Sequence, residues 1–389
     1  MKYNDKTHFC CNQLESKDLN KFVGGGRERC VDIGKGLAMI AIVCGHVCST
    51  WFPGWLTSFW PVAFFFVVAG FYIKEASLLK PIKFIGHKLK TIYLPGTIIY
   101  MLAVLLHNPL CEWGIYPIGQ EHPMTHQTFE LWDAKTYMIQ ILKTIVAPNG
   151  ELAMGAMWFL YALFFALCFL SLIAFVANKI SNEKLTSNSV MFVATMLIST
   201  ISIGLSVYGI KIPRISNALT IIFFIYGGML IKQRFKSGFD NCGLLIASLL
   251  LYVSCIILPH EYMSFPVNRF PDLIMPFVLS VVAVYAILFL SRYIERTRFS
   301  SRVLSYIGEN SLYIMALHIL GFFICTKLMN IIGIGEGLPM ASTLYTYEVG
   351  SNFILAITYL LFGIAFPLLA LYCYKQAKCS IIKVVKRVK

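Results

Sequence analysis

Long apolar stretches alternate with short polar segments along the whole chain. A helix needs roughly 20 residues to cross a hydrocarbon core about 30 Å thick, because each residue adds about 1.5 Å. Segment 136–147 is shorter and is compatible with an interfacial or re-entrant helix. The pattern predicts an all-α integral membrane protein, a bundle of about ten transmembrane helices with both termini on one side. The predicted helices centre on residues 36–50, 59–73, 92–106, 157–177, 189–208, 215–231, 242–258, 272–290, 305–327 and 351–373.

Composition supports the bilayer as the solvent for most of the chain. Of 389 residues, 58% are hydrophobic and 13% are charged, and the mean hydropathy is +0.70. An ordinary soluble domain has about 25% charged residues, so a soluble fold is excluded. Residues 1–32 are polar and of mixed charge, so we expect no cleavable signal peptide and a first helix that stays attached.

The net charge of +14 raises the question of a nucleic-acid partner. With the N-terminus placed in the cytoplasm, the ten-helix arrangement puts 27 of the 33 Lys and Arg residues on the cytoplasmic side. The positive-inside rule explains such a split, so no nucleic-acid partner is needed. The sequence thus predicts a cytoplasmic tail (1–32), a membrane domain (33–374) with an external loop at about 107–156, and a basic cytoplasmic tail (375–389).

The predicted external loop 107–156 is rich in Trp, His and carboxylates, and loops of this length usually have a function. His122 and His126 have helical spacing for a metal ion, but nothing else in the loop has the density of His and Cys residues that a metal site needs. We therefore predict no metal, and interpret the loop as an acceptor-binding surface or a packed lid.

His46 lies inside the first predicted helix. Ionisable side chains at membrane depth are costly and usually face a bundle interior or a wet cavity, where they have a function. Cys44 and Cys48 share one helix face, roughly 200° of rotation from His46, so these three cannot bind one metal. His46 is therefore the first candidate for chemistry.

Lys35 precedes His46 by eleven residues, which returns to nearly the same helix face about 16 Å away along the axis. One stripe therefore joins the cytoplasmic interface to the middle of the membrane. Lys35 is either a topological anchor whose amine reaches the headgroups or a cation that binds a substrate.

The ninth predicted helix begins near Ser305 and contains Asn310, Ser311 and His318. Ser311 and His318 are seven residues apart and share a face. His318 and His46 lie at similar distances from their helix starts, so the two predict a shared polar cavity. The alternative is that Asn310 and Ser311 cap a helix while His318 is a polar interhelical contact.

The cytoplasmic segment from Lys74 to Lys90 is basic. Such loops often only orient a membrane protein. If an anionic donor binds from the cytoplasm, however, Lys88 and Lys90 are placed to meet its phosphates.

In this order, these segments resemble the membrane acyltransferase 3 family, whose members O-acylate sugars and other envelope acceptors with acyl-CoA. The likeness spans residues 27 to about 374. Many members have Arg at the position of Lys35 and Ser at that of Ala69, so Ala69 is not a nucleophile here. The matching pieces are Asp32–Gly36, His46, Phe64–Phe71, Lys88–Pro95, Met157–Leu163 and Gly308–His318.

The resemblance implies His46 as the catalytic residue, Lys35 as the donor-side cation, and Lys88 and Lys90 as contacts for CoA phosphates. It implies acyl-CoA, with acetyl-CoA expected, as co-substrate, no bound cofactor and no metal. The acceptor would be a sugar or glycan, and the location the cell (inner or plasma) membrane. An imidazole can take the proton of a hydroxyl that attacks a thioester or can carry the acyl group itself, and the sequence leaves both roles open.

Two other classes of function fit a polar group at mid-membrane. A transporter of a small polar solute or a lipid-linked sugar would yield no acylated product. A small-molecule sensor would tolerate the loss of His46 in an acylation assay.

Overall fold

A computed structural model describes residues 28–47, 49–57, 59–119, 128–146, 151–181, 186–234, 239–257, 263–333 and 352–388. These residues form helices and connecting turns without a strand, which confirms the predicted all-α class. The shorter helices are α3 (Gly54–Thr57), α4 (Trp60–Phe71), α5 (Glu75–Leu78), α8 (His107–Glu112), α9 (Ala134–Val146), η2 (Leu152–Met157) and α15 (Arg298–Glu309). The longer ones are α2 (Arg29–Val47), α10 (Trp158–Ile180), α11 (Ser187–Val207), α12 (Ile215–Arg234), α13 (Cys242–Ile257), α14 (Ile274–Glu295), α16 (Ser311–Ile331) and α18 (Phe353–Val388).

Eight helices in the described part of the chain are long and apolar enough to cross a membrane. Two shorter apolar helices, α4 and α13, accompany them. Each of the ten predicted segments overlaps one of these ten helices, so the chain is a multi-pass membrane protein. The side on which the termini lie stays a prediction.

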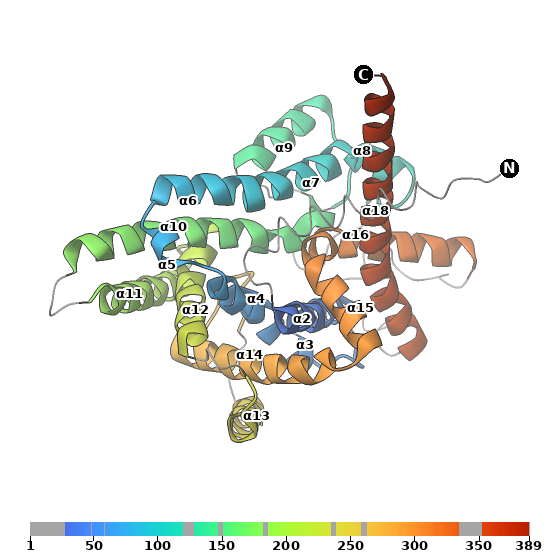
Figure 1. The fold of residues 1–389 in the computed structure, drawn as a ribbon. Coiled ribbons are helices and arrows are strands. Elements are labelled where there is room, and N and C mark those ends of the chain that lie inside the picture. The colour runs from blue at the N-terminus through green and yellow to red at the C-terminus, as the bar shows by residue number, and fades with distance from the viewer. Residues whose placement is uncertain are drawn as a thin grey trace.

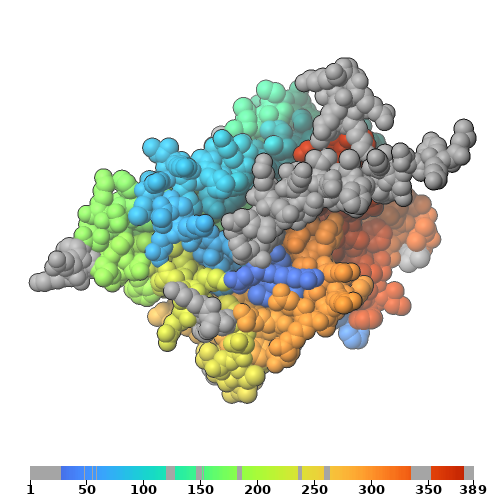
Figure 2. All heavy atoms as spheres, viewed as in Figure 1, coloured from blue at the N-terminus to red at the C-terminus, as the bar shows by residue number. Residues whose placement is uncertain are grey.

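Helix α2 lies at the centre of the bundle (Figure 1). It packs against α4, α14, α15, α16 and α18. In the space-filling view, α2 is a dark-blue strip bordered by yellow and orange segments from the second half of the chain (Figure 2). The helix that carries Lys35 and His46 is therefore surrounded by protein on most sides.

Glycines let α2 and α15 touch through their backbones. A Cβ atom on Gly36 would lie 2.2 Å from the carbonyl oxygen of Leu304, and one on Gly308 would lie 1.9 Å from that of Asp32. Small residues permit such close helix packing in membranes. This contact fixes α15, and hence the start of α16, against α2.

The ninth segment is two helices rather than the single helix expected from Ser305 onward. The chain leaves helical geometry at Asn310, between α15 and α16, where φ is −104°. The amide of Asn310 donates to the carbonyl of Tyr306 at 2.8 Å, and this local bond competes with the helix. As a result α16 begins at Ser311.

The third segment starts earlier than expected. Helix α6 (Pro81–Lys88) continues through a π-helical turn, η1 (Leu89–Tyr93), into α7 (Leu94–Leu105). Pro81 stands at the first helical position, where its missing N–H costs nothing. Lys88 and Lys90 therefore lie on a continuous helix and not in a loop.

Both predicted tails also differ from the expectation. Helix α2 begins at Arg29, before the boundary at residue 32, while residues 1–27 lie outside the described part. Helix α18 continues to Val388, so most of the predicted tail 375–389 is helical.

Ion pairs join several helix ends of the bundle. Glu28 at the start of α2 pairs with Lys232 at the end of α12, and Arg292 at the end of α14 pairs with Asp240. The ten-helix arrangement places the basic partners, Lys232 and Arg292, on the cytoplasmic side. His107 and Glu151, both assigned to the external side, pair with each other. These pairs connect residues that are far apart in the sequence.

Candidate functional site

The structure brings His46 and His318 together inside the bundle. The centroids of their rings lie 5.0 Å apart, with 46° between the ring planes. His46 is near the end of α2 and half-buried, whereas His318 is two turns into α16 and fully buried. The two helices therefore carry their histidines to the same depth.

His318 is held in one orientation by its own helix. Its Nδ1 atom lies 2.9 Å from the carbonyl oxygen of Ile314. A carbonyl only accepts, so Nδ1 carries the proton and Nε2 keeps its lone pair. Nε2 is buried and has no hydrogen-bond partner among the described residues. His318 thus presents an open acceptor nitrogen beside His46.

The imidazole of His46 has its ring contact with His318 and makes no hydrogen bond within the part of the chain that the structure describes. Apolar residues lie nearby: the ring of Phe322 lies 5.8 Å from that of His318, and Val43, three residues before His46, packs close to Gly363. An imidazole without a fixed partner in an apolar wall is free to bind a substrate hydroxyl or acyl group.

Lys35 interacts with a buried carboxylate that sequence reasoning had not assigned. Its Nζ atom lies 3.4 Å from Oδ1 of Asp32 and 5.2 Å from the ring centroid of Tyr72. Asp32 is 2% exposed, and the side chain of Lys35 is 21% exposed. The spacing of three residues between opposite charges was the available signal. The ammonium group of Lys35 therefore lies at the protein surface, next to the buried carboxylate of Asp32.

Lys88 and Lys90 lie on a different part of the bundle. Lys88 is half-buried, with Nζ 5.2 Å from the ring centroid of Phe84, and Lys90 is exposed. Their helix, α6 with η1, packs on α10. Within the described residues no ion pair, hydrogen bond or ring contact joins them to Lys35 or His46, so their donor role stays a prediction.

Asn310 and Ser311 form the break before α16. Asn310 is buried and bonded to Tyr306, while Ser311 is half-buried and begins the helix. Seven residues separate Ser311 from His318, an axial distance of about 10 Å. The observed contacts of Asn310 are those of a helix boundary, and its part in a shared polar cavity stays a prediction.

Comparison with known proteins identifies the family of this chain. The sequence matches the profile of the acyltransferase 3 family, described as an acyltransferase domain, over residues 28–373. The chain belongs to the acyltransferase 3 family. Membership covers nearly the whole chain and makes it a membrane acyltransferase. No curated protein and no solved structure matches this acyltransferase.

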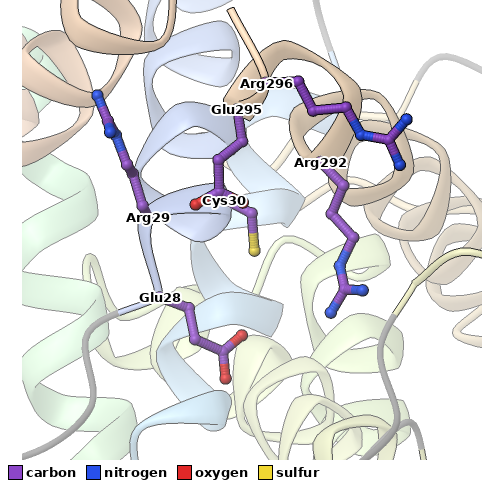
Figure 3. A pocket seen from close by; sticks show the side chains of 6 residues that line it. All are labelled: Glu28, Arg29, Cys30, Arg292, Glu295 and Arg296. Carbon is purple, nitrogen blue, oxygen red and sulfur yellow. The ribbon is translucent and has the colours of Figure 1, made fainter. Parts of the chain in front are cut away.

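The acyltransferase has a polar cavity of about 440 Å³ where α2 begins and α14 ends (Figure 3). Figure 3 shows Arg292 and Arg296 on one side of it and Arg29 on the other. Sequence reasoning had used these arginines only as topological signals. The remaining lining residues are Glu28, Cys30 and Glu295.

On the side predicted to be external, His107 is the centre of a buried contact network. Nδ1 lies 2.8 Å from Oε2 of Glu151, Nε2 lies 3.0 Å from the carbonyl of Glu130, and the ring stacks on Trp132 at 3.5 Å between centroids. The backbone N–H of Glu151 donates to the hydroxyl of Tyr100 in α7, so this part of loop 107–156 is packed onto the bundle. His122 and His126 lie outside the described residues, and the rest of the described chain holds no group of three metal-ligating side chains.

Proposed function

We propose that this protein is a membrane O-acyltransferase. It moves an acyl group, expected to be acetyl, from cytoplasmic acyl-CoA to a hydroxyl of a sugar or envelope polysaccharide precursor. The observation that carries the proposal is the position of His46: an imidazole without a hydrogen-bond partner in the described chain, beside the open nitrogen of His318, inside a membrane acyltransferase.

The reaction needs a base, because a hydroxyl is a poor nucleophile at neutral pH. In the direct route His46 takes the proton as the acceptor oxygen bonds to the thioester carbonyl carbon. The C–S bond then breaks, and the CoA sulfur leaves with the proton returned by His46. In the covalent route the imidazole attacks the thioester carbon and the C–S bond breaks, so CoA leaves as its thiolate. The acceptor oxygen then bonds to the acyl carbon, the acyl–imidazole bond breaks, and the hydroxyl proton passes to the CoA thiolate. His318 acts as a positioning residue in both routes, since its Nε2 can accept from the protonated ring of His46.

Charges at the predicted cytoplasmic end favour an anionic donor. Lys35 lies on the same helix as His46. Of the three arginines of the cavity in Figure 3, Arg29 lies about two turns before Lys35 on α2. Arg292 and Arg296 lie at the end of the neighbouring α14. Guanidinium groups bind phosphate oxygens through paired hydrogen bonds. Acyl-CoA carries phosphates at one end and the thioester at the other, which suits a site that is cationic outside and apolar within.

The test uses purified protein in proteoliposomes, radiolabelled acetyl-CoA, and a glycolipid fraction extracted from membranes of cells that carry the gene. We expect His46-dependent transfer of label to the fraction. Periodate treatment of the fraction, which destroys vicinal diols, should remove its acceptor capacity. If the folded wild-type protein transfers no label to the glycolipid, the proposal is overturned. Movement of an unmodified solute across the bilayer would favour a transporter.

We also propose that the protein resides in the cell (inner or plasma) membrane, where cytoplasmic acyl-CoA and envelope precursors meet. Its multi-pass helices support a bilayer location. Fractionation of cells that express a tagged protein tests this, and recovery in another membrane would contradict it.

A further inference from the structure

Helix α15 turns its large apolar side chains away from the protein. Phe299, Val303 and Tyr306 follow one another at intervals of four and three residues, so they share one face, which we call the outer face of α15. Their exposed fractions are 80%, 42% and 43%. A helix on the surface of a soluble protein buries such side chains and exposes polar ones. The outer face of α15 is therefore suited to an apolar medium.

The opposite face of α15 holds the helix on the bundle through small residues. Ser301, Ser305 and Gly308 are buried. At about 100° per residue, these three lie on the side of the helix away from the outer face. They pack against α2, which lies beside α15 in Figure 1. The bundle therefore leaves the outer face uncovered by α2.

Arginines border the outer face on one side. Arg298 and Arg302 are exposed and lie roughly 90° around the helix from the outer face. Within the described residues neither of them forms an ion pair. Arg296, in the turn before α15, is also exposed, with its guanidinium carbon 4.8 Å from the ring centroid of Tyr293. Residues 296–309 hold these three arginines and one carboxylate, Glu309, which gives the segment a net charge of +2.

An apolar face bordered by cations is typical of a helix that lies in the interface of a membrane. The predicted sidedness puts α15 at the cytoplasmic leaflet, which carries anionic lipids. We infer that α15 binds anionic phospholipids of this leaflet. Arg298 and Arg302 bind the headgroup phosphates through paired hydrogen bonds, and the outer face lies among the acyl chains.

Lipid bound at α15 would act on the histidine pair. Gly36 and Gly308 bring the backbones of α2 and α15 together, and α15 leads through Asn310 into α16. Helices α2 and α16 carry His46 and His318, so an α15 that is fixed by lipid keeps the two rings at their observed separation. The effect of lipid on the rate rests on the proposed function, whereas lipid binding itself does not.

The first experiment measures the binding of phosphatidylglycerol, labelled on an acyl chain, to the purified full-length protein in detergent. The test variant combines Arg298→Gln with Arg302→Gln, and both side chains are exposed, so folding is preserved. The control variant combines Lys80→Gln with Lys179→Gln, which removes the same charge from exposed positions outside α15.

We expect the test variant to bind phosphatidylglycerol at least about tenfold more weakly than the wild type, because each cation near an anionic membrane surface contributes about fivefold. The control variant should bind like the wild type. Equal losses in both variants, or no loss in the test variant, would overturn the inference.

Photocrosslinking identifies what covers the outer face. In one protein p-benzoylphenylalanine replaces Phe299, and in the control it replaces Glu309, which is exposed on the polar side of the same helix. After irradiation of native membranes, mass spectrometry should find phospholipid adducts at position 299 and few at position 309. Adducts at position 299 to residues 1–27 or to another protein, without phospholipid, would overturn the inference.

Rates in proteoliposomes test the effect on the histidine pair, with vesicles of phosphatidylcholine alone or with phosphatidylglycerol added. Phosphatidylglycerol should raise kcat severalfold for the wild type and the control variant. The KM for acetyl-CoA should stay unchanged, because Arg298 and Arg302 do not line the cavity in Figure 3. The test variant should show no increase in kcat, whereas Arg298→Lys with Arg302→Lys should keep part of it, since the charge remains. A change confined to the KM for acetyl-CoA would mean that these arginines bind donor phosphate, and would overturn the inference.

The binding and rate measurements together separate this inference from the proposed function. Lipid binding and crosslinking as expected, with no acyl transfer in any vesicle, would support the lipid site and overturn the acyl-transfer proposal. Normal acyl transfer with unchanged lipid binding in the test variant would do the reverse.

Discussion

At the scale of single residues, His46 should be indispensable because either route of acyl transfer needs its imidazole. We expect His46→Ala to remain inserted and to lose at least about 100-fold in rate, since a positioned base typically contributes roughly 10² to 10⁴. Initial rates in proteoliposomes measure the loss. His87→Ala is the control, since His87 is exposed on α6. Substantial turnover by His46→Ala at normal protein amounts would refute the assignment.

The Lys35–Asp32 pair permits a test of whether the lysine binds the donor or only balances the buried carboxylate. Lys35→Gln should raise the acyl-CoA KM if the lysine meets the donor, and Lys35→Arg should keep much of the activity because the charge remains. Removing one partner of a buried pair leaves the other charge uncompensated. If balance were the sole role, adding Asp32→Asn to Lys35→Gln should restore activity, a recovery that we do not expect. Lys74→Gln, at an exposed position on the same predicted side, controls for net charge.

At the scale of helices, the contact between α2 and α15 depends on glycine. A methyl group at Gly36 would meet the backbone of Leu304, which cannot move aside like a flexible side chain. Gly36→Ala should therefore separate the helices and destabilise the protein by about 1–3 kcal/mol, a usual cost of overpacking. Gly204→Ala is the control, because nothing lies within 4 Å of a Cβ atom there in α11. Thermal unfolding in detergent should rank Gly36→Ala well below both the wild type and the control, and equal midpoints would contradict the contact.

The helices differ in how well the sequence predicts them. Apolar length alone located ten segments, since the bilayer sets that length. The break at Asn310 was predicted only as the alternative in which Asn310 and Ser311 cap a helix, because asparagine is tolerated within helices and its bond to Tyr306 is a three-dimensional detail. Similarly, depth counted from helix starts placed His46 near His318 although the assumed start of α16 was wrong. The network of His107 and Glu151 joins residues 44 positions apart, and no spacing rule links such positions.

At the scale of the whole molecule, donor and acceptor are expected to reach His46 from opposite sides of the membrane. The polar cavity and Lys35 lie toward the start of α2, whereas Tyr116 of the predicted external loop contacts Phe323, which lies beyond the histidine pair along α16. This arrangement requires residues 107–156 to be external and the short connection between α10 and α11 to be cytoplasmic. The direction of α2 in the membrane therefore decides which substrate meets which end.

Labelling with an impermeant maleimide tests that direction through single cysteines introduced as Lys135→Cys and Lys179→Cys, both at exposed positions. The native cysteines that are exposed in the described part of the chain, Cys242 and Cys373, are replaced by serine. Burial, with help from Glu151 and Glu112, raises the pKa of native Cys111 to about 11, so its thiol stays protonated and reacts slowly at pH 7. In intact cells position 135 should label at once, and position 179 only after permeabilisation. The opposite order would mean that the protein is inserted in the opposite orientation, with residues 107–156 in the cytoplasm and the 27 basic residues outside, against the positive-inside rule.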